Sequence, residues 1–479
     1  MKNLIAIFFL FAATKQSFAT DYLASTVEEA ISLFKKAQAG DRILLKNGTY
    51  KNETIKLQNL NGTAAQQITF AAQNPGKVSF EENSTLSVTG NYITIAGFTF
   101  KNGGNDVGTR SVIELKTTHS TLSDCAIIDY NSEKTIDNKW VSIYGEYNTV
   151  THSLFKDKRN LGATLTVWLT PGKEAHHTIS YNYFNGRHNG PQEDNGLESI
   201  RIGDSKTSFE NSHCVVALNR FENCDGEIEI ISNKSFHNSY LHNSFINSDG
   251  GLTLRHGNEC LVDGNFFDGG NKPKSYGVRF IGEGHVAINN YFYNLKGAPN
   301  ENFRAPVTLV TGLVNTPING YFQVKRALVA NNIFVNCAMP NIRVGATPKR
   351  DGATLAPDSV AIQNNVFFND QESGAQVYEE VLSPNHLTIS SNKIIGNNLR
   401  ANTKGFENIS SKGVKRSDFD CSNNAKGNAI ASIICKASLP STKAGASFVD
   451  PSIIKEIAGR KYTIVSAEMV GPTWKSGNN

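Results

Sequence analysis

The sequence lacks a strong charge of either sign. Its 47 Lys and Arg residues stand against 43 Asp and Glu, so the formal net charge of the 479 residues is only +4. Nucleic-acid binders and membrane-surface proteins usually carry a denser basic excess, so we expect neither as a partner. Any contact with an acidic polymer must therefore come from Lys and Arg residues that are placed locally. Proline, with 14 residues, is also scarce beside 40 glycines.

Paired cysteine spacings of the kind that bind zinc are absent too. The seven cysteines are scattered, and we expect most of them to be buried as small hydrophobic residues; they are Cys125, Cys214, Cys224, Cys260, Cys337, Cys421 and Cys435. Cys421 and Cys435 flank a loop rich in Gly and Asn, and they are the one pair that we predict to form a disulfide in an exported chain.

No apolar run is long enough for a membrane span, which needs roughly 20 residues. The N-terminus instead carries Lys2, a short apolar run from Leu4 to Ala13, and the small-x-small pattern Ser17-Phe18-Ala19. This arrangement is typical of a cleavable signal peptide, which we place at residues 1–19. Its removal takes away two lysines and lowers the formal charge from +4 to +2. The mature protein is predicted to be secreted or periplasmic.

The middle of the chain repeats a phrase of alternating apolar residues that ends in Asn-x-Phe. Its asparagines are Asn182, Asn219, Asn243, Asn265, Asn290, Asn332 and Asn365, with a weaker copy at Asn392. A period near 24 residues with insertions indicates a solenoid, and the alternation indicates strands. A β-propeller would need blades of about 40 residues joined by hairpins. We therefore predict an all-β, right-handed parallel β-helix in which the Asn and Phe side chains stack inside.

The two ends of the solenoid are expected to be covered, because they expose strand edges. Ser25-x-x-Glu28 predicts a capping box that opens a short N-terminal helix, closed by Gly40. Its apolar stripe comprises Val27, Ala30, Ile31, Phe34 and Ala37. Residues 20–400 are predicted to form the catalytic β-helix. Residues 401–479 lose the repeat and are predicted to be an irregular segment that wraps the end of the same domain.

Polar residues recur at a similar phase of four consecutive coils, namely Asn195, Glu227 with Glu229, Arg255 and Arg279. Glu227 and Glu229 are two residues apart, so on a strand both carboxylates point to one side while Ile228 and Ile230 point to the other. Two such carboxylates stay ionised if a cation lies between them. An amide oxygen from Asn195 would complete an all-oxygen set suited to Ca²⁺. The alternative is a solvated acidic pair on a surface strand, and the nearby Lys234 and Arg255-His256 argue against it.

Three segments here resemble polysaccharide lyase family 6, which contains β-helical alginate lyases and chondroitinase B. They are Asn195-Gly-Leu-Glu-Ser-Ile-Arg-Ile-Gly203, Glu227-Ile-Glu-Ile-Ile-Ser-Asn-Lys234-Ser235 and Leu254-Arg255-His256-Gly257. Looser similarity covers most of residues 20–370. The resemblance implies that Asn195, Glu227 and Glu229 bind Ca²⁺. It also implies that Lys234 is the general base and Arg255 the general acid, with His256 beside them.

The implied chemistry is β-elimination on a uronate. The proton on C5 is too weakly acidic to be removed unless the neighbouring carboxylate is neutralised, which a bound Ca²⁺ would do. Arg255 is a poor true acid because a guanidinium keeps its proton in proteins. We therefore treat Arg255 as an electrostatic donor that relays a proton through water, with His256 as a candidate helper.

Five further residues are candidates for substrate binding. Arg201, Arg279 and Arg304 are predicted to grip flanking uronate carboxylates. Tyr144 is predicted to face the groove near the cleaved bond, and His188 lies in a polar loop, Gly186 to Gly196, that is predicted to form a groove wall. The alternatives are ordinary surface charges, a core tyrosine and a solvated loop.

The sequence thus predicts a lyase that acts on alginate, with dermatan sulfate as the second candidate substrate. A hydrolase remains the alternative among enzymes, with Glu227 and Glu229 as an acid and base pair. A non-catalytic β-helical adhesin or glycan-binding module is the alternative outside enzymes. The sequence does not determine whether cleavage is endolytic or exolytic, nor the oligomeric state. An unsaturated uronate in the products would distinguish a lyase from a hydrolase and from a glycan-binding module.

Overall fold

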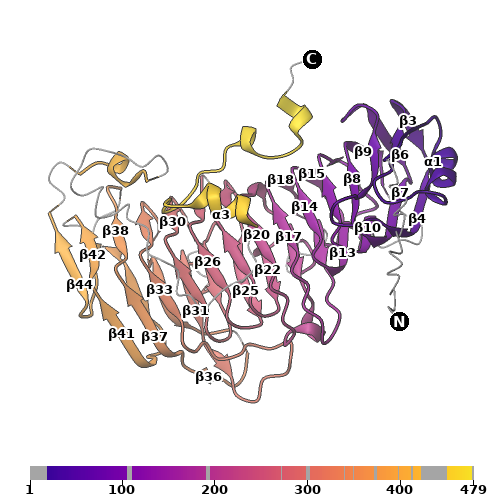
Figure 1. The fold of residues 1–479 in the computed structure, drawn as a ribbon. Coiled ribbons are helices and arrows are strands. Elements are labelled where there is room, and N and C mark those ends of the chain that lie inside the picture. Colours follow the sequence, from indigo (N-terminus) through magenta and orange to yellow (C-terminus); the bar gives the residue numbers. More distant parts are fainter. Residues whose placement is uncertain are drawn as a thin grey trace, which may run out of the picture.

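The computed structural model of the protein is a parallel β-helix whose coils stack along one long axis (Figure 1). It describes residues 19–104, 111–189, 195–270, 272–297, 302–338, 340–348, 350–371, 375–396, 399–410, 414–421 and 450–476. The predicted signal peptide lies almost wholly outside these residues. Among the described residues, no helix is long and apolar enough to cross a membrane.

Each coil contributes one short strand to each of three long sheets, and neighbouring coils pair in parallel. Sheet A contains β1 (Asp21–Ala24), β2 (Arg42–Leu45), β5 (Ile68–Ala72), β8 (Ile93–Ala96), β11 (Thr121–Ser123), β14 (Thr149–Thr151), β17 (Thr178–Ser180), β20 (Val215–Ala217), β23 (Ser239–Leu241), β26 (Leu261–Asp263), β29 (Val286–Ile288), β33 (Leu328–Ala330), β37 (Asp358–Gln363) and β41 (Asn385–Ser390). Sheet B contains β3 (Gly48–Lys51), β6 (Val78–Glu82), β9 (Phe98–Gly103), β12 (Ala126–Ile128), β15 (Leu154–Lys158), β18 (Tyr183–Arg187), β21 (Arg220–Cys224), β24 (Ser244–Ile246), β27 (Phe266–Asp268), β30 (Tyr291–Tyr293), β34 (Ile333–Val335), β38 (Val366–Phe368), β42 (Asn392–Ile395) and β44 (Phe406–Ile409).

Sheet C is the sheet on which the candidate site lies. It contains β4 (Thr54–Asn61), β7 (Thr85–Asn91), β10 (Ser111–Thr118), β13 (Lys139–Glu146), β16 (Leu165–Val167), β19 (Ile200–Ile202), β22 (Glu229–Lys234), β25 (Gly251–His256), β28 (Val278–Phe280), β31 (Val307–Val310), β35 (Ile342–Ala346) and β40 (Tyr378–Glu380). Two small pairs stand outside the three sheets, β32 (Gly312–Leu313) with β36 (Ala353–Leu355) and β39 (Ala375–Gln376) with β43 (Leu399–Arg400).

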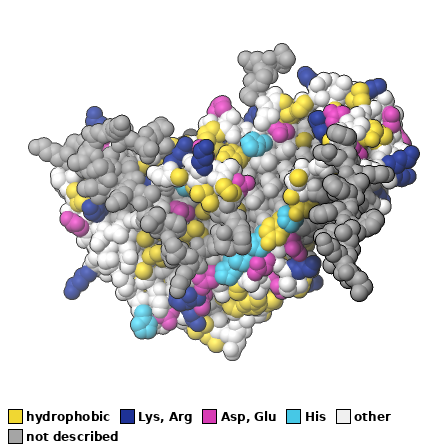
Figure 2. Space-filling view, viewed as in Figure 1, with side chains coloured by type: hydrophobic (Ala, Val, Ile, Leu, Met, Phe, Trp, Pro, Cys, Tyr) yellow, Lys and Arg dark blue, Asp and Glu magenta, His cyan; other side chains and the backbone are white. Residues whose placement is uncertain are grey.

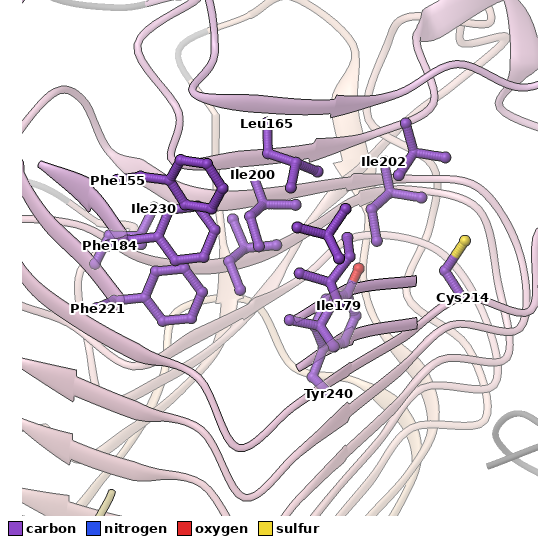
Figure 3. Close-up of a cluster of buried hydrophobic side chains, with 14 of the residues drawn as sticks. Phe155, Leu165, Ile179, Phe184, Ile200, Ile202, Cys214, Phe221, Ile230 and Tyr240 are labelled. Atoms are coloured by element: carbon purple, nitrogen blue, oxygen red, sulfur yellow. The ribbon is translucent and has the colours of Figure 1, made fainter. Parts of the chain in front are cut away.

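The predicted internal ladders are confirmed. Asn265 donates through Nδ2 to Oδ1 of Asn290 at 3.0 Å, and its own Oδ1 accepts from the backbone N–H and Nδ2 of Asn243. The same pattern links the asparagines from Asn182 to Asn392, all of which are fully buried. Beside this ladder the phenylalanines stack with centroids about 4.5–5.0 Å apart. Figure 3 shows Phe155, Phe184 and Phe221 in such a column, facing aliphatic residues of sheet C across the core.

The N-terminal cap is the predicted short helix, shifted by one residue at its start and ending at Phe34, several residues before the predicted end at Gly40. Helix α1 (Val27–Phe34) is capped by Thr26, whose side chain accepts from the N–H of Glu29, and Glu29 in turn accepts from the N–H of Ser25. The capping pair is therefore Thr26 with Glu29 rather than Ser25 with Glu28. Val27, Ala30 and Phe34 are buried against the first coils, as the apolar stripe predicts.

The C-terminal strap, residues 450–476, runs back along the β-helix toward its N-terminal end (yellow in Figure 1). It contains α3 (Pro451–Ile457) and the 3-10 turns η3 (Ala467–Met469) and η4 (Thr473–Ser476). Along the strap, Thr463 bonds His242 at 2.8 Å, the N–H of Gly471 donates to the carbonyl of Tyr181, and Trp474 donates to the carbonyl of Asp124. The strap therefore ties together coils that are far apart in the sequence.

The cysteines behave largely as predicted. Cys125, Cys214, Cys224, Cys260 and Cys337 are free and buried. Cys421, in the segment that follows the 3-10 turn η2 (Arg416–Phe419), forms a disulfide, and its predicted partner Cys435 lies outside the described residues. On the outer surface, Figure 2 shows histidine side chains in a diagonal row across the visible face. Stacked His and Tyr rings line one turn of successive coils, with centroids about 4.7–5.1 Å apart.

Candidate active site

A pocket of about 650 Å³ lies on the outer face of sheet C. Seven of the predicted site residues line it together, although they are spread over about 85 residues of sequence; they are Asn195, Glu227, Glu229, Lys234, Arg255, His256 and Arg279. The β-helix brings them together because each coil returns the chain to the same face. The predicted polar ridge is therefore one site.

Two β-bulges in the pairing of β22 with β25 bracket this pocket. Glu229 lies opposite Gly251 while Ile231 lies opposite Leu252, so Ile230 is the extra residue of the first bulge. Asn233 lies opposite Leu254 while Lys234 lies opposite His256, so Arg255 is the extra residue of the second. A bulge bends its strand and redirects side chains, which is a common feature next to active sites. The second bulge places the predicted base and the predicted donor side by side in one pair of strands.

The two glutamates meet in the pocket, but the predicted local structure was wrong for one of them. β22 begins at Glu229, and Glu227 lies in the bend before it. Ile228 lines the pocket instead of pointing away from it, whereas Ile230 enters the core as predicted. The N–H of Leu197 donates to Oε1 of Glu227 at 3.2 Å, so the segment that follows Asn195 is tied directly to the acidic pair.

The electrostatics of the acidic pair favour a cation. Burial, followed by the charges of Glu198 and Glu229, raises the pKa of Glu227 to about 9. Glu198 is itself buried, and its Oε2 finds no hydrogen-bond partner among the described residues. On the other side, Nη2 of Arg279 contacts Oε1 of Glu229 at 2.5 Å, and both side chains are almost fully buried. Arg279 thus compensates the charge of one glutamate, and Glu227 is left with a charge that its surroundings disfavour.

The donor set fits a hard cation. Across the described residues, no three His, Cys, Asp or Glu side chains gather into a metal site. The available set is instead two carboxylates and one amide, from Glu227, Glu229 and Asn195, in one pocket. All three donors are oxygen atoms, which Ca²⁺ prefers. A bound dication would relieve the crowding of negative charge around Glu227.

Lys234, Arg255 and His256 form the basic side of the pocket. Lys234 is half-buried at the end of β22. Arg255 donates to the carbonyls of Gly320 and Asn319, at 2.7 and 3.0 Å, and burial lowers the pKa of its guanidinium. Burial, followed by the charges of Arg255 and Lys234, lowers the pKa of His256 to about 3. His256 is therefore neutral in the free protein and is not a store of a proton for the leaving group.

Two predicted substrate contacts lie on the same face of sheet C, toward the N-terminal coils. The ring of Tyr144 stacks on that of Trp168, with centroids 6.1 Å apart. The guanidinium of Arg201 lies 5.2 Å from the ring centroid of the same Trp168. All three side chains are partly exposed. They form a row beside the pocket that is suited to a sugar ring with a carboxylate.

The other two predicted contacts lie away from the pocket. Arg304 is 8% exposed and donates to the carbonyls of Asp249 and Lys274, so it holds backbone segments together rather than facing a ligand. Arg304 does not line the pocket, and the prediction that it grips a substrate carboxylate gains no support from these contacts. His188 is exposed and bonds Asp157 at 3.2 Å outside the pocket lining, and residues 190–194 of its loop lie outside the described residues.

Several pocket residues escaped the sequence analysis. Phe303, Tyr321 and Arg350 line the pocket from insertions between coils. The guanidinium of Arg255 lies 4.4 Å from the ring of Tyr321, and that of Arg350 lies 5.4 Å from the same ring. The long intervals from Asn290 to Asn332 and from Asn332 to Asn365 mark the insertions that carry these residues, but nothing in their sequences indicates where the insertions fold.

Comparison with known proteins agrees with this fold. The sequence model of the chondroitinase B family matches residues 24–438. No curated protein matches the chain. The family 6 alginate lyase AlyGC is 29% identical with a TM-score of 0.76, and the alignment covers 95% of this chain but only 59% of AlyGC.

Two further structures have the same fold. A mannuronic acid-specific family 6 lyase from human gut microbiota is 26% identical over 81% of this chain and 91% of its own, with a TM-score of 0.69. A family 6 polysaccharide lyase from Pseudopedobacter saltans is 24% identical over 95% and 99%, also with a TM-score of 0.69. The family match spans most of the chain, and so this protein belongs to the chondroitinase B family, among the family 6 polysaccharide lyases.

Proposed function

We propose that this protein is a polysaccharide lyase that cleaves alginate by Ca²⁺-assisted β-elimination. The observation that carries the proposal is one pocket that joins an all-oxygen acidic set to a lysine and three arginines. A bound Ca²⁺ would be held by Asn195, Glu227 and Glu229 and would neutralise the uronate carboxylate. The similarity to AlyGC and to the mannuronic acid-specific lyase supports alginate over dermatan sulfate.

The protein's own residues divide the remaining work. Lys234 takes the C5 proton, the electrons of that C–H bond form the C4–C5 double bond, and the bond from C4 to O4 breaks. Arg255 donates hydrogen bonds toward the leaving O4, which receives its proton from water, because the guanidinium keeps its own. His256 is neutral and lines the pocket beside Lys234 and Arg255. One product carries the former O4 as the hemiacetal hydroxyl of a new reducing end, and the other carries the unsaturated uronate at its non-reducing end.

A substrate screen tests the proposal. The purified protein is incubated with alginate, dermatan sulfate and pectate, and the ultraviolet absorption of unsaturated uronate is followed. We expect it to appear first with alginate. Products with saturated ends only would contradict a lyase and favour the hydrolase, with Glu227 and Glu229 as its acid and base. Binding of polymer without any product would favour a glycan-binding module.

We also propose that the protein is exported, because its polysaccharide substrate lies outside the cytoplasm. The support is the N-terminal pattern of Lys2, the apolar run and Ser17-Phe18-Ala19. N-terminal sequencing of the protein after expression in a bacterial host with an export pathway tests it. A mature chain that begins near Thr20 is expected, and a chain that retains Met1 in the cytoplasmic fraction would contradict it.

A further inference from the structure

Two segments from opposite flanks of sheet C meet over its outer face. Phe303 lies in the connection that leads from sheet B into β31, and Tyr321 lies in the connection that leads from β31 to sheet A. Their ring centroids are 6.2 Å apart at an interplanar angle of 21°. We call this pair the aromatic bridge. Because both residues line the pocket, the bridge crosses the face on which the pocket lies.

The aromatic bridge is fixed to the basic side of the pocket. The guanidinium of Arg279 lies 5.4 Å from the ring of Phe303, and that of Arg255 lies 4.4 Å from the ring of Tyr321. Arg255 also donates to the carbonyls of the two residues that precede Tyr321. The segment is further held by β32, which pairs with β36, and by Gln323, which donates to the carbonyl of Ala356. The bridge is thus a built part of the wall and not a free loop.

The face of sheet C is sealed beneath the bridge. Arg279 is 3% exposed, and Ile281, Thr308 and Val310 are 0% exposed. Thr308 follows Arg279 in the same outward column of the ladder. Ile281 and Val310 are apolar and fully buried, yet neither belongs to the hydrophobic core inside the coils. Their cover therefore lies on the outer side of sheet C, where the connections that carry the bridge run.

In the opposite direction along sheet C, the described residues provide no such cover. The side chain of Lys116 on β10 is 46% exposed, and Tyr144, Trp168 and Arg201 on or beside the following strands are partly exposed. These residues present rings and cations at successive coils. An acidic polymer therefore finds a continuous row of contacts on the N-terminal side of Lys234 and a wall about one coil beyond Arg255, since coils repeat every 4.8 Å or so.

We infer that the pocket is blind at its C-terminal side and that the enzyme is exolytic: the end of a uronate chain enters the pocket, stops against Phe303 and Tyr321, and a short product leaves after each cleavage. Phe303 and Tyr321 are then specificity-determining residues that set the product length. The inference rests on the proposed lyase function. An internal stretch of a polymer would have to pass through the bridge, and the described residues of the sealed face leave no path for it.

The test uses the full-length protein with polymeric alginate and Ca²⁺. Ultraviolet absorption counts the cleaved bonds while viscosity and size-exclusion chromatography follow the length of the polymer. We expect short products of uniform size from the first minutes, with the polymer peak and the viscosity nearly unchanged. A rapid loss of viscosity with a broad series of oligosaccharides would overturn the inference. Absence of unsaturated product from every polymer would instead contradict the lyase function itself.

Variants separate the bridge from the open side. Phe303→Ala should shift the products toward longer oligosaccharides and speed the loss of viscosity per bond cleaved. Trp168→Ala, which removes an aromatic side chain from the open side, is the matched control and should raise KM for polymer without a change in product length. If Phe303→Ala fails to fold, Phe303→Leu keeps the packing and should produce a smaller shift. Unchanged product length in a folded Phe303 variant would overturn the role of the bridge.

Discussion

Replacement of Lys234 is the sharpest test of the catalytic assignment. Lys234 ends β22 opposite His256, and it is the one lysine that lines the pocket within the described residues. Removal of a general base typically costs about 10²–10⁴ in rate, which corresponds to about 2.7–5.4 kcal/mol of transition-state stabilisation. We therefore expect Lys234→Ala to lose at least about a hundredfold in kcat. The side chain is only half-buried, so its loss should leave the fold intact.

Lys234→Arg separates the proton from the charge. An arginine keeps the positive charge near Glu227 and the substrate, but a guanidinium does not give up its proton at the pH of the reaction. We expect this variant to be nearly as slow as Lys234→Ala. If charge alone mattered, Lys234→Arg would instead recover most of the activity.

The assay measures initial rates by the ultraviolet absorption of unsaturated uronate, with short alginate oligosaccharides at saturating concentration. Calorimetry with the same oligosaccharides and circular dichroism serve as controls for binding and folding. Both variants should bind substrate and Ca²⁺ like the wild type. Near-normal turnover by Lys234→Arg would refute the base role and direct attention to Tyr144 or to His256.

Three further predictions concern the cation, the core and pH. Chelation should abolish turnover and Ca²⁺ should restore it, and Glu229→Ala should lose Ca²⁺ binding by calorimetry; a metal-free Glu229→Ala enzyme with full activity would exclude the site. Asn265→Leu should lower the free energy of unfolding by about 2–6 kcal/mol, because the N–H of Asn243 and the carbonyl of Tyr240 lose buried partners. Denaturant unfolding measures this change, and a loss below about 1 kcal/mol would contradict the prediction. Burial lowers the pKa of His242 to about 3 from the usual 6.5. Its contribution to stability is therefore complete above pH 6.5 and declines by about 1.4 kcal/mol per pH unit below it. His242→Gln should reduce this decline of unfolding free energy with falling pH, and an unchanged decline would count against a buried neutral imidazole.

The fold was predictable because its information is local and repeated. Each Asn-x-Phe phrase specifies one bend, one inward amide and one inward ring, and the next coil repeats them in register. Asn290 and Asn332 show how robust this is, because 42 residues separate them and their amides still bond at 3.0 Å. The insertion leaves the ladder as a loop and does not change its phase.

The pocket was only partly predictable, because part of it comes from those insertions. Residues on the strands, such as Glu229 and Arg279, could be aligned by counting from the ladder. Phe303 and Tyr321 lie in connections with no repeat, so no period assigns them a face. Arg304 is the opposite case, since this charged residue lies close to the ladder phase but bonds backbone carbonyls and does not line the pocket.

The bulge at Arg255 shows what counting residues along the sequence can predict. The count correctly places Arg255 one coil from Lys234, but it does not predict which residue pairs with Lys234. Arg255 lies 21 residues after Lys234, which suggests a direct partner one coil away. The ladder instead pairs Lys234 with His256 and leaves Arg255 as an extra residue. One added residue reverses which side of the sheet a chain position faces, and the bulge absorbs this change within a single turn.

One outward column of sheet C lies largely buried beside the residues that line the pocket. Arg201, Ser232, Thr253 and Arg279 follow one another in register on consecutive strands. The two small hydroxyl residues are fully buried between two arginines, and Thr253 is held by the hydroxyl of Tyr276 at 2.9 Å. Short side chains on these two coils leave room for Tyr276, whose hydroxyl bonds both Thr253 and the carbonyl of the pocket residue Ile228. Thr253→Leu removes the hydroxyl partner of Tyr276 and should displace its ring toward Ile228, so we expect weaker substrate binding, although Thr253 carries no charge and takes no part in proton transfer.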